Sequence, residues 1–112
     1  MKIIATTALG VLAAMLAMST AQAAPDADAA QKLAKDSGCM KCHAVDKSKK
    51  GPSFQKTAAK YKGKADGEAK IHDLITKTTK VKFEDGSEDD HGAVKSKDEA
   101  QIKNLTQWIL SQ

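Results

Sequence analysis

Apolar and small residues recur at helical spacing near the start of the chain. In the segment 25–38, Ala30, Leu33 and Ala34 lie three or four positions apart, and Gly38 follows them. This spacing places the three side chains on one face of a helix, and glycine commonly ends a helix. We therefore expect a first helix here, with a narrow apolar face made of small residues.

The middle of the chain predicts two more helices. A short helix is expected over 54–62, where Gly63 ends it. A third is expected over 65–80, because apolar residues again recur at helical spacing. The residues expected on its apolar face are Ile71, Leu74, Ile75 and Thr78.

The last helix has the clearest pattern. Ser96 and Glu99 match the S-x-x-E form of a capping box, which marks a helix N-terminus. The apolar residues that follow, at i, i+3, i+6 and i+7, are Ile102, Leu105, Trp108 and Ile109. Residues 81–95 are rich in Gly, Asp and Glu and are expected to form a loop, and no strand pattern is found. The prediction is one all-α domain of about four short helices.

The first 23 residues have the pattern of a secretory signal. A positive start, Met1-Lys2, precedes an apolar run, and the small-x-small sequence Ala21-Gln22-Ala23 follows it. Such segments are removed after export, so residues 24–112 are expected to form the mature periplasmic domain. An uncleaved N-terminal anchor is the alternative, although the apolar run is short for a membrane span.

The composition limits the classes of function. All 18 basic side chains are lysines, and the formal net charge is +4. Arginine is favoured where proteins recognise phosphates and bases, so nucleic acid is not an expected partner. The chain has only two Phe, one Tyr and one Trp, which is few for the core of a small domain. We therefore expect a bound group to fill its centre.

The stretch CMKCH has the C-x-x-C-H spacing at which c-type haem is attached. Cys39 and Cys42 would form thioethers with the two vinyl groups, and His43 would then bind the iron as its proximal ligand. A thioredoxin-like disulfide would need a βαβ context. A structural zinc would need two more ligands at fixed spacing, and only His72 and His91 remain. One covalently attached haem c is the favoured interpretation.

Together these segments resemble a class I cytochrome c, the small monohaem type. The resemblance rests on SGCMKCHAVD, GPSF, AAKYKG and IKNLTQWILS, and it covers nearly all of 26–80 and 96–112. It implies that the first and last helices cross at their small and apolar faces. It also implies that the Pro52 carbonyl accepts the proton on the outer ring nitrogen of His43, which fixes the tautomer and raises the basicity of the ligand.

The usual sixth ligand of that family is a methionine before the last helix, and this chain has no methionine after Met40. Met40 itself lies within the attachment stretch, on the proximal side. His91, near Gly86 and Gly92, lies about where that methionine falls, so we expect His91 to bind the iron. An open or water-bound site and ligation by His72 are alternatives. So is a lysine that has lost its proton; the candidates are Lys80, Lys82 and Lys95.

Histidine in place of methionine lowers the haem potential. The favoured function is an exported electron-transfer protein rather than an enzyme. We expect the protein to be a monomer that docks redox partner proteins transiently. Lysines near the attachment stretch would dock an acidic partner; they are Lys41, Lys47, Lys49 and Lys50. In the alternative, His91 leaves the iron on reduction, and the haem binds a small gas such as NO or CO. A module of a larger respiratory complex is a third possibility.

Overall fold

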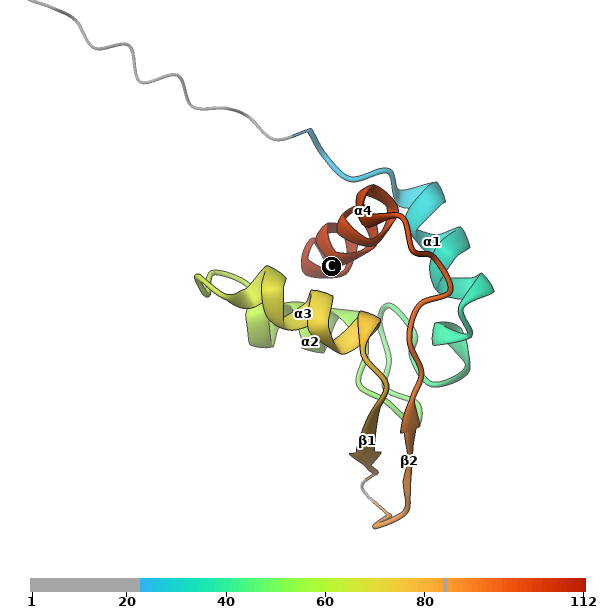
Figure 1. Cartoon of the computed structure of the whole chain (residues 1–112). Helices are drawn as coiled ribbons and strands as arrows, with labels where there is room; N and C mark the ends of the chain where they lie inside the picture. The colour runs from blue at the N-terminus through green and yellow to red at the C-terminus, as the bar shows by residue number, and fades with distance from the viewer. Residues whose placement is uncertain (1–22, 84) are drawn as a thin grey trace, which may run out of the picture.

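The computed structural model describes residues 23–83 and 85–112. Within them lie four α-helices, one turn of 3-10 helix and one β-hairpin. In chain order these are α1 (Ala27–Asp36), the 3-10 turn η1 (Cys39–Lys41), α2 (Phe54–Tyr61), α3 (Gly67–Thr76), β1 (Thr79–Lys82), β2 (Glu88–His91) and α4 (Glu99–Leu110). Figure 1 shows the helices gathered in one body, from which the hairpin projects. The predicted fold class, a mainly helical domain with four short α-helices, is confirmed.

The predicted signal segment lies outside the described residues, apart from Ala23. In the part of the chain that is described, no helix has the length and apolar character needed to cross a membrane.

Helices α1 and α4 pack against each other, as Figure 1 shows. Ala30 and Ala34 of α1 and Leu105 of α4 are fully buried, and the small alanine side chains let the two helices approach closely. Two hydrogen bonds join the start of α1 to α4. The Oδ1 atom of Asn104 accepts from the Asp26 N–H (2.8 Å), and its Nδ2 atom donates to the Asp26 carbonyl (2.9 Å).

The N-terminus of α4 differs from the predicted capping box. Asp98 is the N-cap, and its carboxylate accepts from the N–H groups of Ala100 (2.9 Å) and Gln101 (3.4 Å). The Ser96 hydroxyl accepts from the Asp98 N–H and donates to Oε1 of Gln101. A carboxylate is the stronger acceptor for orphan N–H groups and interacts favourably with the helix dipole. Asp98 therefore takes the role that the pattern assigned to Ser96.

Helix α3 is shorter than the 65–80 pattern predicts. Lys77 already has an extended backbone (φ −110°, ψ 135°), so Thr78 lies beyond the helix. The threonines around this point favour extended structure, because their branched Cβ is stiff in a helix. Ile71 and Ile75 are buried as expected, whereas Leu74 remains 36% exposed.

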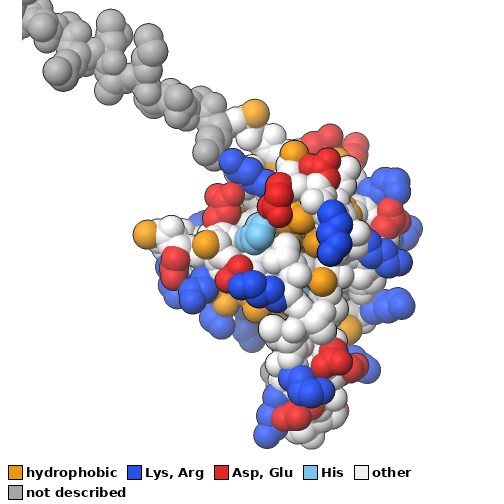
Figure 2. Space-filling model, viewed as in Figure 1, with side chains coloured by type: hydrophobic (Ala, Val, Ile, Leu, Met, Phe, Trp, Pro, Cys, Tyr) orange, Lys and Arg blue, Asp and Glu red, His pale blue; other side chains and the backbone are white. Residues whose placement is uncertain are grey.

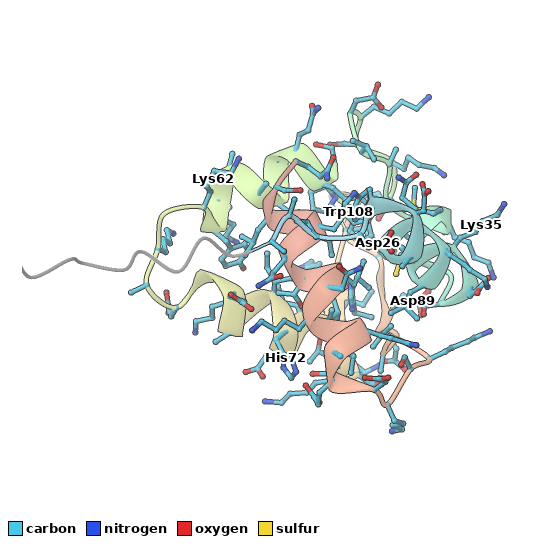
Figure 3. All side chains as sticks on the ribbon, turned by 90° about the horizontal axis from the view of Figure 1, so that it is seen from above. Asp26, Lys35, Lys62, His72, Asp89 and Trp108 are labelled. Atoms are coloured by element: carbon cyan, nitrogen blue, oxygen red, sulfur yellow. The ribbon has the colours of Figure 1, made fainter. Side chains whose placement is uncertain are left out.

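The apolar faces of α2, α3 and α4 meet in the centre of the molecule. The rings of Phe54 and Trp108 pack edge to face, with centroids 5.5 Å apart, an arrangement that aromatic pairs prefer. Figure 3 shows Trp108 in the middle of the molecule. The buried apolar residues of this core are Ala30, Ala34, Phe54, Ile71, Ile75, Val94, Ile102, Leu105, Trp108 and Ile109.

Strands β1 and β2 pair as an antiparallel hairpin, so the expectation of a loop without strands is wrong. Thr79 of β1 lies opposite His91 of β2, and Lys82 lies opposite Glu88. This register places His91 at the base of the hairpin, where β2 returns to the helical body. The hairpin therefore determines where the histidine lies.

The turn of the hairpin explains why this segment pairs. The Phe83 N–H donates to the Ser87 carbonyl (2.8 Å), and the Gly86 N–H donates to the Phe83 carbonyl (3.0 Å). Gly86 has φ +84°, a left-handed conformation that glycine adopts without strain. Asp-Gly between two extended segments is a hairpin signal, but the acid-rich composition of 81–95 obscured it. Gly86 therefore serves the turn rather than a close approach to a bound group.

Candidate functional site

Both cysteines and His43 lie on one tight turn after α1. Gly38 has φ +81° and redirects the chain into η1. The N–H groups of Cys42 and His43 both donate to the Cys39 carbonyl, at 3.2 and 3.0 Å. The cysteines are free thiols and half-buried, and burial raises the pKa of the Cys39 thiol. The turn thus presents two thiols and one imidazole within a few residues.

The ring of His43 is oriented by the Gly51-Pro52 turn. Its Nδ1 atom donates to the Pro52 carbonyl oxygen at 2.6 Å, the contact that the family resemblance implies. A carbonyl can only accept, so Nδ1 carries the proton and Nε2 keeps its lone pair. A Cβ at position 51 would lie 2.5 Å from Cε1 and 2.9 Å from Nδ1 of this ring. Only glycine fits between the backbone and the imidazole.

Phe54 supports the same ring from the core. It stacks on His43, with centroids 5.3 Å apart and planes 20° apart, and packs edge to face against Trp108. The apolar pattern of the sequence predicted no role for Phe54 in the site. Its position two residues after Pro52 is a signal that could have done so, because Pro52 itself contacts His43.

His91 approaches His43 from the base of the hairpin. The two ring centroids are 6.1 Å apart, with the planes at 62°. The Nδ1 atom of His91 is buried and has no hydrogen-bond partner within residues 23–83 and 85–112. Burial lowers the pKa of His91, and the nearby His43 lowers it further. The lowered pKa favours the neutral ring, the form in which imidazole binds metals.

Both histidines line one largely apolar cavity of about 360 Å³. Its walls come from α2, α3, the end of α4, the Gly51-Pro52 turn and the hairpin. Its apolar and aromatic lining residues are Pro52, Phe54, Tyr61, Ile71, Leu74, Ile75, Val81, Phe83 and Ile109. Buried apolar walls with two convergent imidazoles are typical of a cofactor pocket.

The spacing of the two rings fits a metal ion between them. Metal–imidazole bonds are about 2 Å long, so two such bonds and two ring radii add to roughly 6 Å. This agrees with the 6.1 Å between the centroids. The apolar walls and the unpartnered nitrogen of His91 fit a flat, largely apolar group that carries a metal at its centre.

The competing candidate His72 does not line this cavity. It lies on α3, and its Nε2 atom is 3.0 Å from a carboxylate oxygen of Glu99. Figure 3 shows His72 near the periphery, away from Trp108. The His72 side chain is 35% exposed. Of the candidate lysines, Lys82 borders the cavity, whereas Lys80 is paired with Asp90 at 3.2 Å.

Comparison with known proteins identifies the family. The family described as Cytochrome c matches residues 27–112. The chain belongs to the cytochrome c family. Cytochrome c-551 of Azotobacter vinelandii is 33% identical over 85 residues, which make up 72% of this chain and 94% of that protein. Cytochrome c-551 of Pseudomonas aeruginosa is 36% identical over 86 residues, which make up 71% of this chain and 73% of that protein.

Solved structures of cytochromes also match this cytochrome c. The class 1 cytochrome MtoD from Sideroxydans lithotrophicus ES-1 is 52% identical, with a TM-score of 0.74, and the match covers 79% of this chain and 97% of that chain. Wild-type cytochrome c552 of Nitrosomonas europaea is 27% identical, with a TM-score of 0.58 over 72% of this chain and 96% of that chain. As a member of this family, the chain carries one covalently attached haem c and transfers electrons.

Proposed function

We propose that this cytochrome c is an exported electron-transfer protein with two histidines on its iron. Cys39 and Cys42 attach the haem, and His43 and His91 bind the iron. The observation that supports the proposal best is the pair of imidazoles 6.1 Å apart on the walls of one apolar cavity. No methionine follows Met40 in the sequence, so the segment before the last helix offers no thioether ligand.

When bound, the haem iron takes up and releases one electron. His43 keeps its proton on Nδ1 by donating to Pro52, so Nε2 remains a basic ligand atom. Burial lowers the pKa of His91 and so favours its neutral form. Phe54 fixes the plane of the His43 ring, and the apolar walls exclude water. Two imidazoles favour the ferric state, so the potential lies below that of relatives with a methionine ligand.

Export and partner docking belong to the same proposal. Residues 1–23 act as a cleaved signal, which the mass of the purified protein tests directly. Four lysines near the attachment turn dock an acidic redox partner in a transient complex, and the protein itself is a monomer. All four are exposed; they are Lys41, Lys47, Lys49 and Lys50.

The test is the absorption spectrum of the holoprotein, ferric and ferrous, with and without carbon monoxide. We expect low-spin spectra in both states and no carbon monoxide uptake, because His91 occupies the sixth position. His91→Ala should become high-spin and bind carbon monoxide when reduced. His72→Ala is the matched control, and its spectra should equal those of the unaltered protein.

A second function, binding of a small gas, is favoured by one observation. His91 stands on a two-stranded hairpin, and such hairpins are marginally stable on their own. If the ferrous protein without substitutions turns high-spin and takes up carbon monoxide, His91 leaves the iron on reduction. Gas binding then replaces electron transfer as the leading function.

A further inference from the structure

The hairpin has two chemically different faces. Val81, Phe83 and His91 are half-buried and line the cavity, whereas Lys80 and Asp90 are exposed. Side chains alternate between the faces of a strand, and residues directly opposite each other share a face. By the register, Asp89 shares the inner face with Val81 and His91 but is exposed, and the outer face carries the charges of Lys80, Lys82, Glu88 and Asp90.

Those charges are complementary across the two strands. The register places Lys80 opposite Asp90 and Lys82 opposite Glu88, and the Lys80 Nζ atom lies 3.2 Å from Oδ1 of Asp90. Figure 2 shows basic and acidic side chains together on the hairpin, at the lower end of the molecule. Opposite charges in directly opposed positions stabilise strand pairing.

The chain is anchored again directly after His91. The Val94 N–H donates to the Ile75 carbonyl at the end of α3 (2.7 Å), and both side chains are buried. The segment between Ile75 and Val94 is thus closed at its base by one backbone bond. His91 lies between these anchors, at the end of a strand that pairs with β1.

We propose that Lys80 and Asp90 are positioning residues that hold β2 against β1 and thereby hold His91 on the iron. In this proposal, separation of the two strands releases His91 from the iron. The inference rests on the proposed ligation by His91. Because the Lys80 and Asp90 side chains are 74% and 60% exposed, dissolved salt screens their attraction. The release of His91 is therefore faster at high ionic strength.

The release rate is measurable with cyanide as the probe. Ferric holoprotein is mixed with increasing cyanide, and the rate of the spectral change reaches a limit set by dissociation of His91. Cyanide is present mostly as uncharged hydrogen cyanide at neutral pH, so salt acts on the protein and not on the encounter. We expect Lys80→Gln to raise the limiting rate about two- to fivefold at low salt. The salt dependence should largely disappear in this variant.

The exchange of both charges separates attraction from local packing. Lys80→Asp combined with Asp90→Lys should return the limiting rate towards that of the unaltered protein. The matched control is Lys77→Gln, which removes a lysine–aspartate pair of the same 3.2 Å length between Lys77 and Asp73 of α3. This control should leave the limiting rate unchanged, even where it lowers the urea midpoint as much as Lys80→Gln does.

Three outcomes would overturn the proposal. The rate in Lys80→Gln could equal that of Lys77→Gln, or the double exchange could react as fast as Lys80→Gln. In both cases His91 remains the ligand, and only the role of the ion pair fails. If the protein without substitutions shows no limiting rate and reacts like His91→Ala, the sixth position is open. The assignment of His91 as a ligand then fails together with the positioning role of Lys80 and Asp90.

Discussion

The imidazole rings of His43 and His91 lie 6.1 Å apart, although one follows a 3-10 turn and the other ends a β-strand. The two rings differ in how they are held. His43 is fixed by Pro52 on one side and by Phe54 on the other, within the helical body. His91 depends on a two-stranded hairpin. Changes at His43 should therefore affect the whole fold, and changes at His91 should affect mainly the iron.

The first prediction concerns the identity of the distal ligand. His91→Met replaces a basic imidazole with a thioether, which stabilises the ferrous state. We expect the potential to rise by on the order of 100 mV, a fraction of the roughly 0.8 V that axial ligands span. Voltammetry of the holoprotein measures the change. A new absorption band from the thioether–iron bond should appear at the same time.

His72→Met is the control for this substitution. It introduces the same thioether on α3, at a residue paired with Glu99 outside the cavity, and should leave the potential unchanged. A potential in His91→Met equal to that of the unaltered protein would show that position 91 does not bind the iron.

The second prediction concerns the contact between Gly51 and His43. Gly51→Ala places a Cβ 2.5 Å from the ring, so the imidazole or the turn must move. We expect the loss of about 1–3 kcal/mol in the free energy of unfolding, the usual cost of overpacking. The hydrogen bond from His43 to Pro52 should weaken, and the potential should shift with it. Urea unfolding and voltammetry of the holoprotein measure the two effects.

Gly63→Ala separates these two effects. Gly63 has φ +77°, and a Cβ at this position would have no atom within 4 Å, so alanine there costs about 1–2 kcal/mol through backbone strain alone. The potential should not change in this control. If both glycine variants shift the potential equally, the effect at position 51 reflects general destabilisation.

The third prediction concerns Phe54. Phe54→Leu removes the stacking on His43 and the edge-to-face contact with Trp108, each worth about 0.5–1.5 kcal/mol. We expect a loss of about 1–3 kcal/mol in stability and broader signals for the His43 ring in NMR spectra. Phe83→Leu is the control because Phe83 is half-buried on the hairpin, and it should cost less. An equal loss of stability in Phe54→Leu and Phe83→Leu would contradict the stabilising role of the contacts that Phe54 makes with His43 and Trp108.

The helices were predictable because each buries one face. Leu105 and Trp108 recur at helical spacing, and both are buried. Their spacing alone therefore located α4, although the choice between Ser96 and Asp98 as its cap depended on the side-chain geometry of the first turn. Cap residues a few positions apart compete, and the periodicity does not decide between them.

The hairpin was not predictable from apolar periodicity because its outer face is held by charges. Lys80 and Asp90 pair across the strands, so a strand such as Glu88–His91 contains no apolar alternation at all. His91 was singled out by the resemblance to class I cytochromes c, whose methionine ligand precedes the last helix. The strand that carries it, and the support of His43 by Phe54, depend on contacts between segments far apart in the sequence.

The last prediction concerns the turn of the hairpin and its dependence on pH. The Ser87 hydroxyl and N–H both donate to Asp85 Oδ1, and these bonds lower the pKa of Asp85 from its ordinary value of 3.8. Because the folded-state pKa is the lower one, the contribution to turn stability is complete above the ordinary pKa. It is lost as the pH falls through the folded-state pKa.

Ser87→Ala removes the hydroxyl donor, the largest cause of the shift, and keeps the backbone donor. The pKa of Asp85 should therefore rise towards 3.8 without reaching it. Carbon-detected NMR titration of the carboxyl groups between about pH 7 and pH 2 measures this rise. The carboxyl of Asp36, whose pKa is lowered by Lys32, is the internal control and should not move. An unchanged pKa for Asp85 would mean that the serine hydroxyl does not stabilise the turn.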